Sequence, residues 1–276
     1  MGSDLRSISP SFKNLRFFFT DVEDLNISDF DVLDNFFNNS AIDFVVNCAA
    51  YTQVDKAETD KELAMQLNAV APGYLADLSV KYKYKLIHIS TDFVFDGTQN
   101  TPYTEEDKPK PIGYYGETKL AGEEAVKQKA PDSIIIRTSW LYSSFGNNFV
   151  KTMLRLGKDR GLMKVVYDQA GTPTYARDLA AAIIQIISFP GNDKISGMFH
   201  YSNEGVISWY DFAQAIYEIK RIKCIVNPIR TVEYPTPTKR PAYSVLDKAK
   251  IKTTFGLEIP YWRDSLRECM GLFRTA

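Results

Sequence analysis

A tyrosine and a lysine four residues apart are the first candidates for chemistry in this chain. Tyr115 and Lys119 lie in the run Tyr115-Gly-Glu-Thr-Lys119, and this spacing puts both side chains on one face of a helix. A nearby cation favours the phenolate, so we expect Lys119 to lower the pKa of Tyr115 toward the range of a general acid. The alternative is a surface helix with an incidental tyrosine and lysine.

A strand that ends in hydroxyl groups precedes this pair. Leu86-Ile-His-Ile leads into Ser90 and Thr91. Ligands of open α/β sheets bind at the carboxyl ends of parallel strands, where Thr91 or Ser90 could hydrogen-bond the same substrate oxygen as Tyr115. The combination is suited to protonating a carbonyl oxygen while a hydride reaches its carbon.

The composition is that of an ordinary globular protein. The chain has 276 residues, 45% of them hydrophobic and 24% charged, with a net charge of −1. This charge offers no basic field for nucleic acid or acidic lipid, and we expect neither as a partner. No apolar run approaches the roughly 20 residues of a membrane span, and no signal peptide is recognisable. The three cysteines are Cys48, Cys224 and Cys269; their spacing fits neither a metal motif nor a disulfide framework and favours a reducing cytoplasm.

Short β-rich runs alternate with helical patterns, which predicts an α/β fold with a Rossmann-like, doubly wound parallel sheet. The expected strands are residues 16–20, 43–47, 85–90, 133–137 and 164–167. The expected helices are residues 29–39, 58–82, 113–129, 146–158, 176–188, 208–220 and 262–273. We expect a dinucleotide-binding region over 1–140. Residues 141–276 should form mainly a smaller substrate-binding lobe, with late segments returning to the first region.

Several separate motifs resemble those of the dTDP-4-dehydrorhamnose reductase family, an extended branch of the short-chain dehydrogenase/reductases. They include Ser90-Thr-Asp-Phe-Val-Phe-Asp-Gly97, Tyr115-Gly-Glu-Thr-Lys-Leu-Ala-Gly-Glu123 and the segments 46–58, 137–142, 146–149, 168–174 and 234–241. The resemblance runs over nearly the whole chain. It implies reduction of the 4-keto group of dTDP-4-dehydro-L-rhamnose by NADPH or NADH.

The resemblance also implies roles for individual residues. Tyr115 would protonate the nascent oxyanion, Lys119 would hold the cofactor ribose, and Thr91 would hydrogen-bond the carbonyl oxygen. Further cofactor contacts would come from Gly2, Asp21, Asn26, Ile27, Ala49, Ala50 and Tyr51. The acidic Asp21 tilts the choice toward NADH, because a carboxylate disfavours a 2′-phosphate. Tight packing around the alanines and a solvated turn at Asp21 are the alternatives.

Substrate contacts are implied at Val54, Asp92, Phe93, Trp140, Asn148 and Arg240. Arg240 would bind the diphosphate, since a guanidinium binds phosphate oxygens in a bidentate manner. Phe93 departs from some relatives that carry tyrosine, so we expect one hydrogen bond to the sugar to be absent. A core tryptophan at Trp140 and a loop-building asparagine at Asn148 are the competing interpretations. His88, inside a predicted strand, is interpreted as a buried histidine with its hydrogen bonds satisfied.

The start of the chain departs most from the family. Relatives open with a strand and a Gly-x-x-Gly-x-x-Gly turn that wraps the cofactor pyrophosphate. Met1-Gly2-Ser3 corresponds to the tail of that turn or to a cloning scar. The missing strand would be central in the order 3-2-1-4-5-6, so its loss should leave strand edges without hydrogen-bond partners. We therefore expect the natural protein to begin upstream.

Two other functions remain open. The same fold serves as a regulatory subunit of methionine adenosyltransferase, and the absent glycine turn favours that class, whereas Thr91, Tyr115 and Lys119 favour an enzyme. An epimerase or dehydratase of the extended family is the other alternative; Asp92-Phe93 lacks the Asp-Glu pair usual in dehydratases. Some relatives form magnesium-linked dimers, so Mg²⁺ and a homodimer are options by resemblance only. No ligand cluster in the sequence demands a metal.

The incomplete glycine turn predicts weak or absent dinucleotide binding by the 276-residue chain. Fluorescence titration with NADPH, for this chain and for one extended at its N-terminus, measures the effect. Tight NADPH binding by the chain as given would contradict the expectation.

Overall fold

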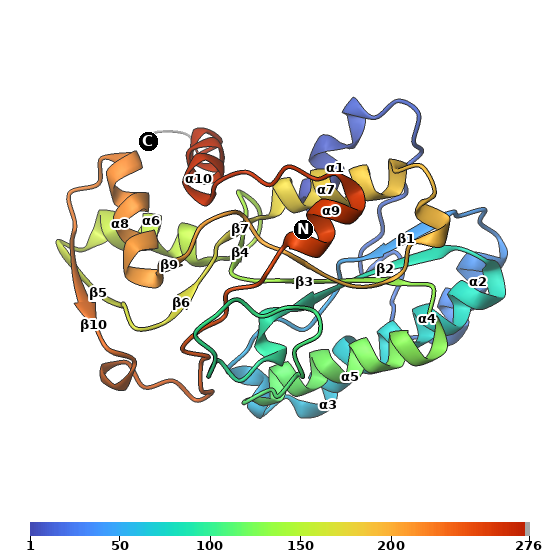
Figure 1. Ribbon diagram of the computed structural model, residues 1–276, viewed down its shortest axis with the longest axis horizontal. Helices are drawn as coiled ribbons and strands as arrows, with labels where there is room; N and C mark the ends of the chain where they lie inside the picture. The colour runs from blue at the N-terminus through green and yellow to red at the C-terminus, as the bar shows by residue number, and fades with distance from the viewer. Residues whose placement is uncertain (274–276) are drawn as a thin grey trace.

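A parallel β-sheet with helices on both faces forms the larger part of the protein, in a computed structural model that describes residues 1–273 (Figure 1). The strand order is β1-β2-β3-β8, and every neighbouring pair is parallel. The strands are β1 Phe44–Asn47, β2 Lys85–Thr91, β3 Ile134–Thr138 and β8 Gly197–Tyr201. This arrangement confirms the predicted α/β class.

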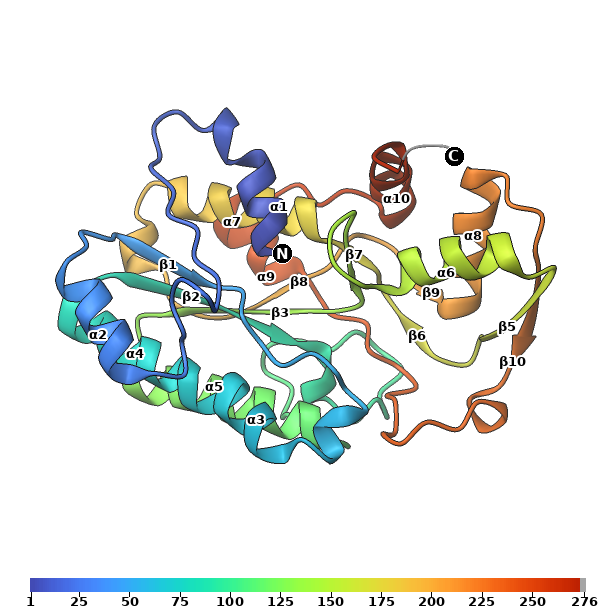
Figure 2. The ribbon, with the colours of Figure 1, turned by 180° about the vertical axis from the view of Figure 1, so that it is seen from behind.

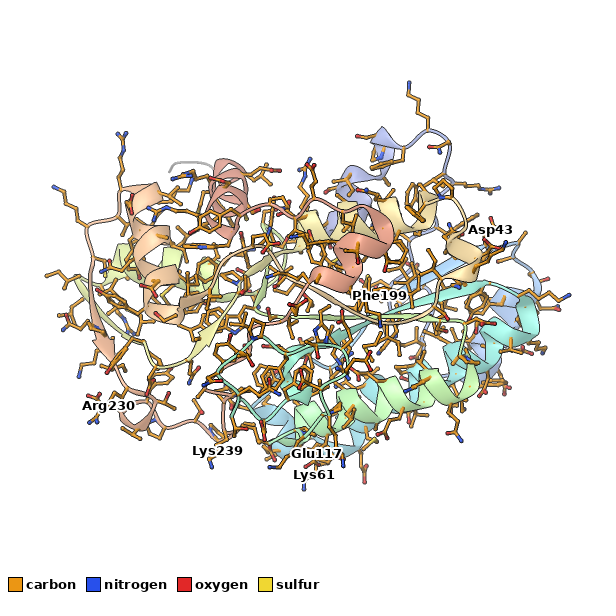
Figure 3. The ribbon with its side chains drawn as sticks, viewed as in Figure 1. Asp43, Lys61, Glu117, Phe199, Arg230 and Lys239 are labelled. Atoms are coloured by element: carbon orange, nitrogen blue, oxygen red, sulfur yellow. The ribbon has the colours of Figure 1, made fainter. Side chains whose placement is uncertain are left out.

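The alternation of side chains along the central strands builds a separate core on each face of the sheet. Leu86 and Ile135 point to the layer that holds α2 Phe30–Asn38, α4 Ala71–Tyr82 and α5 Tyr114–Lys129. Ile87 and Ile134 point to the opposite layer, with α1 Gly2–Ile8, α7 Ala176–Ser188 and α9 Ala249–Phe255 (Figure 2). Figure 3 labels Phe199 on β8. Its ring centroid lies 5.2 Å from that of Phe255 of α9.

The smaller lobe lies at the end of the sheet away from α2 (Figure 1). Its core joins α6 Phe149–Asp159, α8 Trp209–Lys220 and α10 Trp262–Gly271 to β5 Leu162–Val166 and β10 Ile225–Ile229. β5 and β10 pair in parallel with each other, outside the main sheet. Two short pairs lie between the lobes: β4 Leu141–Tyr142 with β7 Thr174–Tyr175, and β6 Ala170–Gly171 with β9 Ile207–Ser208.

The helix expected over residues 58–82 is divided into several pieces. A 3₁₀ turn Lys56–Glu58 and α3 Lys61–Met65 are followed by a π-helical turn, Gln66–Val70, before α4. The π turn carries Asn68, whose side chain bonds both the amide and the carbonyl of Tyr51 and the hydroxyl of Thr118. These tertiary hydrogen bonds stabilise the irregular turn. Single π-helical turns of this kind are frequent at functional sites.

Several expected boundaries are corrected by the structure. Residues 16–20 form no strand, because no neighbouring strand is present to bond them; β1 pairs only with β2 among the described residues. The strand expected at 164–167 is β5, and it lies in the smaller lobe. The sequence interpretation missed β8, β10 and α9, whose short runs resemble ordinary loop sequence.

Gly122 of α5 allows this helix to lie directly against the π turn. A Cβ at this position would overlap the carbonyl oxygen of Asn68. We expect Gly122→Ala to lower the free energy of unfolding by about 1–3 kcal/mol, as overpacking does, measured by chemical denaturation. Gly271→Ala is the control, because its added Cβ meets no atom within 4 Å. Equal stability of the two variants would contradict the close approach of α5.

Candidate active site

The carboxyl end of β2 and the first two turns of α5 bring Thr91, Tyr115 and Lys119 together. The Thr91 hydroxyl lies close enough to the phenol of Tyr115 to lower its pKa. The Lys119 Nζ donates to the Ile89 carbonyl at 2.7 Å. All three side chains are buried. The helix begins at Tyr114, whose amide donates to Glu58 at 3.0 Å, so the start of α5 is held beside the segment that follows β1.

Burial sets the electrostatics of this group. It raises the pKa of Tyr115 to about 12. The Thr91 hydroxyl lowers this pKa, and the charge of Asp92 raises it further. Burial likewise lowers the pKa of Lys119 to about 8, while Glu123 raises it. The expectation that Lys119 brings the pKa of Tyr115 down is therefore wrong: desolvation outweighs the cation, whose ammonium is turned to the Ile89 carbonyl.

A buried ion pair, missed in the sequence, holds this corner in place. Arg137 at the end of β3 binds Glu123 of α5 through two hydrogen bonds of 2.9 and 2.6 Å. Glu123 also accepts the Ser90 hydroxyl at 2.5 Å. The available signals were a glutamate one turn after Lys119 on the same helix face and an arginine that ends an apolar strand.

The expected cofactor residues next to β1 gather at its carboxyl end. Gly2 starts α1, and a Cβ there would lie 3.9 Å from that of Cys48, which precedes Ala49 and Ala50. Tyr51 is anchored by Asn68 and by a 2.7 Å hydrogen bond to Asp60, which raises the pKa of its phenol to about 12.

The residues expected around the adenosine shape local turns. Asp21 is exposed and accepts the Val22 amide at 2.7 Å. Asn26 accepts the Ser28 amide at 3.0 Å, and Ile27 packs at the rim of the core beneath α2. Among the described residues, none of the three is hydrogen-bonded to Thr91, Tyr115 or Lys119.

Three of the expected substrate residues form one wall beside Tyr115. Val54 and Phe93 belong to its apolar cluster, and the rings of Phe93 and Tyr115 meet edge to face at 5.5 Å. The guanidinium of Arg240 lies 5.9 Å from the Phe93 ring and binds Asp55 at 2.8 Å. The loop that carries Arg240 is fixed to the segment after β1 by a bond from the Thr238 amide to Asp55.

Trp140 and Asn148 have structural contacts of their own. Trp140 has a φ of 46° and stacks on Trp209 with 3.6 Å between ring centroids, with Gly171 leaving room for the indole. Asn148 caps α6 by accepting the Lys151 amide, and it donates to the Ser143 carbonyl at 2.7 Å. These contacts match the packing and loop-building alternatives.

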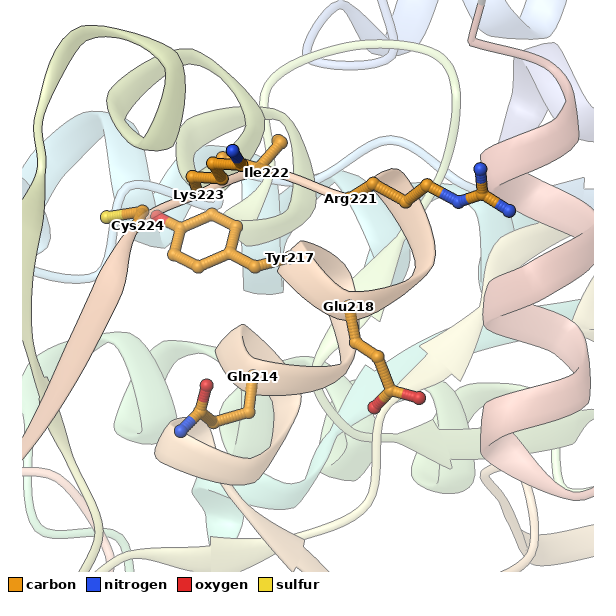
Figure 4. Close-up of a pocket in the computed structure, with 7 residues that line it drawn as sticks. All are labelled: Gln214, Tyr217, Glu218, Arg221, Ile222, Lys223 and Cys224. Carbon is orange, nitrogen blue, oxygen red and sulfur yellow. The ribbon is translucent and has the colours of Figure 1, made fainter.

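One pocket of the structure lies away from this corner. It is lined by α8 and the turn after it, including Tyr217, Arg221 and Cys224, and measures about 630 Å³ (Figure 4). It is open to solvent and shares no residue with the candidate site. Within residues 1–273, no three His, Cys, Asp or Glu side chains are grouped to hold a metal, and no helix has the length and apolar character to cross a membrane.

A doubly wound parallel sheet with a threonine, a tyrosine and a lysine at its carboxyl edge defines a nicotinamide-dependent oxidoreductase of the short-chain dehydrogenase/reductase type. The model of the family described as RmlD substrate binding domain matches residues 1–274, and the chain belongs to this family.

Relatives support this membership in sequence and structure. A dTDP-4-dehydrorhamnose reductase of Aggregatibacter actinomycetemcomitans is 40% identical over 255 residues, 90% of this chain and 87% of the relative. The crystal structure of a Clostridium acetobutylicum dTDP-4-dehydrorhamnose reductase superposes with a TM-score of 0.93 at 42% identity, covering 98% of this chain and 95% of that one. The Bacillus anthracis enzyme, solved in complex with NADP, gives 0.92 at 35% identity, covering 97% and 95%.

Lys119 is a buried cation, and it should cost stability. Its pKa is lowered from 10.5 to about 8, so the cost is complete below pH 8 and disappears as pH rises toward 10.5. We expect Lys119→Met to raise the free energy of unfolding at pH 7 by roughly 1–3 kcal/mol, with the gain shrinking above pH 8. Denaturation at several pH values measures this. Lys127→Met, at an exposed position of the same helix, is the control. A lower free energy of unfolding for Lys119→Met than for the unmodified protein at pH 7 would contradict the prediction.

Proposed function

We propose that this protein reduces the 4-keto group of dTDP-4-dehydro-L-rhamnose with NAD(P)H to give dTDP-L-rhamnose, a nucleotide sugar for polysaccharide synthesis. The observation that carries the proposal is the burial of Thr91, Tyr115 and Lys119 at one corner, where the start of α5 meets the carboxyl end of β2. Family membership and the relatives' activity support the substrate.

Each side chain has a defined task in this reaction. Tyr115, with a pKa of about 12, keeps its proton at neutral pH and gives it to the developing C4 oxyanion. Thr91 donates a hydrogen bond to the same oxygen. Lys119 donates one of its three N–H groups to the Ile89 carbonyl, which leaves two N–H groups for the ribose hydroxyls. The nicotinamide, when bound, supplies the hydride.

The chain's own residues fit the cofactor. Ala49 and Ala50 keep side chains short where the dinucleotide backbone passes, at the edge of the sheet. We propose that both NADH and NADPH are used and that Asp21, exposed after residues 16–20, favours NADH. Val54, Asp92, Phe93, Trp140, Asn148 and Arg240 are proposed to contact the substrate. Arg240 would then exchange Asp55 for the diphosphate.

The broader assignments rest on the same grounds. We propose residues 1–140 as the dinucleotide-binding region and 141–276 as mainly the substrate lobe, in a cytoplasmic enzyme. The three cysteines, all unpaired, are compatible with a reducing compartment. A homodimer is proposed by family resemblance alone. The proposed mechanism uses no Mg²⁺.

Removal of the Tyr115 hydroxyl tests the mechanism. We expect Tyr115→Phe to lower kcat by roughly 10²–10⁴-fold, because the proton donor is lost while the ring keeps its packing. NADPH oxidation with dTDP-4-dehydro-L-rhamnose measures the effect, with NADH run in parallel. The neighbouring Tyr114→Phe is the control, since Tyr114 faces Lys61 at 5.1 Å.

Unchanged turnover in Tyr115→Phe would remove Tyr115 from the mechanism. An unmodified protein that folds and binds NADPH but leaves the keto-sugar unreduced would refute the proposed function itself.

A further inference from the structure

The hydroxyl of Thr91 lies between two groups that compete for its single hydrogen. Its Oγ1 is 3.0 Å from Oδ1 of Asp92, to which it donates. On its other side the hydroxyl lies near the phenol of Tyr115, whose pKa it lowers. The Phe93 amide donates to the same Oγ1 at 3.3 Å.

The capacity of a hydroxyl group limits what Thr91 can do. It has one hydrogen and two acceptor positions, of which the Phe93 amide takes one. When the hydrogen points to Asp92, only a lone pair faces Tyr115 and the substrate oxygen. In that state Thr91 cannot donate to the oxyanion, which is the role the mechanism gives it.

The surroundings of Asp92 bring its carboxyl group close to the pH at which it gains or loses its proton. Its side chain is 2% exposed, and within the described residues its Oδ2 has no hydrogen-bond partner. Burial raises the pKa of Asp92 to about 6. The hydroxyls of Ser244 and Thr91 and the backbone amides of Asp92 and Phe93 lower this pKa, but by less than burial raises it.

We propose that the protonation state of Asp92 sets the direction of the Thr91 hydrogen bond, and that Thr91 donates to the substrate oxygen only while Asp92 is protonated. The inference rests on the proposed function and gives Asp92, already proposed as a substrate contact, a second role that acts through Thr91. A protonated Asp92 donates its own O–H to the free lone pair of Thr91, which releases the threonine hydrogen toward the substrate. No proton leaves Asp92 in this step; the Thr91 hydroxyl only rotates.

The charged and titratable groups around Asp92 do not take its place as the group that changes protonation state beside Thr91. On α5, Tyr115 keeps its proton and the ammonium of Lys119 binds the Ile89 carbonyl. On β2, burial holds the pKa of His88 far below its usual value, so His88 stays neutral. From the facing loop, Arg240 is bound to Asp55.

The pH dependence of kcat/KM for the keto-sugar tests the proposal, because this parameter reports groups of the free enzyme. For the unmodified protein we expect kcat/KM to decline by about tenfold per pH unit above pH 6. The decline ends when the hydrogen bond from Thr91 to the substrate oxygen no longer contributes to the rate. In Asp92→Asn the amide N–H₂ replaces the carboxylic O–H as donor and does not titrate. This variant should lose the decline, so that its kcat/KM relative to the unmodified protein rises about tenfold from pH 7 to pH 8.

Matched variants separate a hydrogen-bond switch from a general charge effect. Asp96→Asn changes a carboxylate of the same segment, outside the site, whose pKa is lowered by Thr98; it should keep the decline. In a Thr91→Val background no hydroxyl remains to be directed, so Asp92→Asn should no longer alter the pH profile.

Three results would overturn the proposal. They are a decline that persists in Asp92→Asn, an effect of Asp92→Asn that survives in Thr91→Val, and a folded, NADPH-binding Asp92→Asn protein that is inactive at every pH.

Failure of the proposed function is observed separately, as absence of turnover in an unmodified protein that folds and binds NADPH. In that event the pH dependence of unfolding still decides. The pKa of Asp92 is obtained from the difference in stability between proteins with and without the Asp92→Asn substitution. Thr91→Val should raise this pKa, because the carboxylate loses a hydrogen-bond donor, and an unchanged value would refute the hydrogen-bond coupling.

Discussion

The packing of α5 against the carboxyl half of β2 is the interaction on which the candidate site depends. Polar groups, not only apolar ones, make this contact: Lys119 to Ile89, and Glu123 to Ser90 and Arg137. Removing one partner of the buried Arg137–Glu123 ion pair should cost about 3–5 kcal/mol, because a charge is then left unpaired in the interior. The pairing therefore specifies how α5 is rotated and which side chains reach the strand end. Gly116 contributes as well, since a Cβ there would overlap the Phe93 carbonyl.

Desolvation at this contact decides the protonation of the chemical groups. The same burial raises the pKa of Tyr115 and of Asp92 and lowers that of Lys119. In each case the neutral form is favoured, as expected where water is excluded. A neutral tyrosine is a proton donor that does not lose its proton to bulk water between turnovers, which suits a reductase that must protonate an alkoxide at neutral pH.

Segments far apart in the chain complete the site. The loop after β10 returns from the smaller lobe and is fixed by Thr238 and Arg240 to Asp55, on the segment after β1. Ser244 in the same loop lies near Asp92. The same loop therefore contributes both to the wall beside Phe93 and to the surroundings of Asp92.

The sequence by itself determined the α/β class, the pairing of Tyr115 with Lys119 on one helix face and the hydroxyls at the end of the preceding strand. These follow from local periodicity: four residues along a helix and the polarity change at a strand end. Only the tertiary structure decided the pKa direction of Tyr115, the bond of Thr91 to Asp92 and the absence of a strand at 16–20. Burial, hydrogen-bond competition and strand pairing depend on neighbours distant in the chain, and local sequence patterns carry no record of those neighbours.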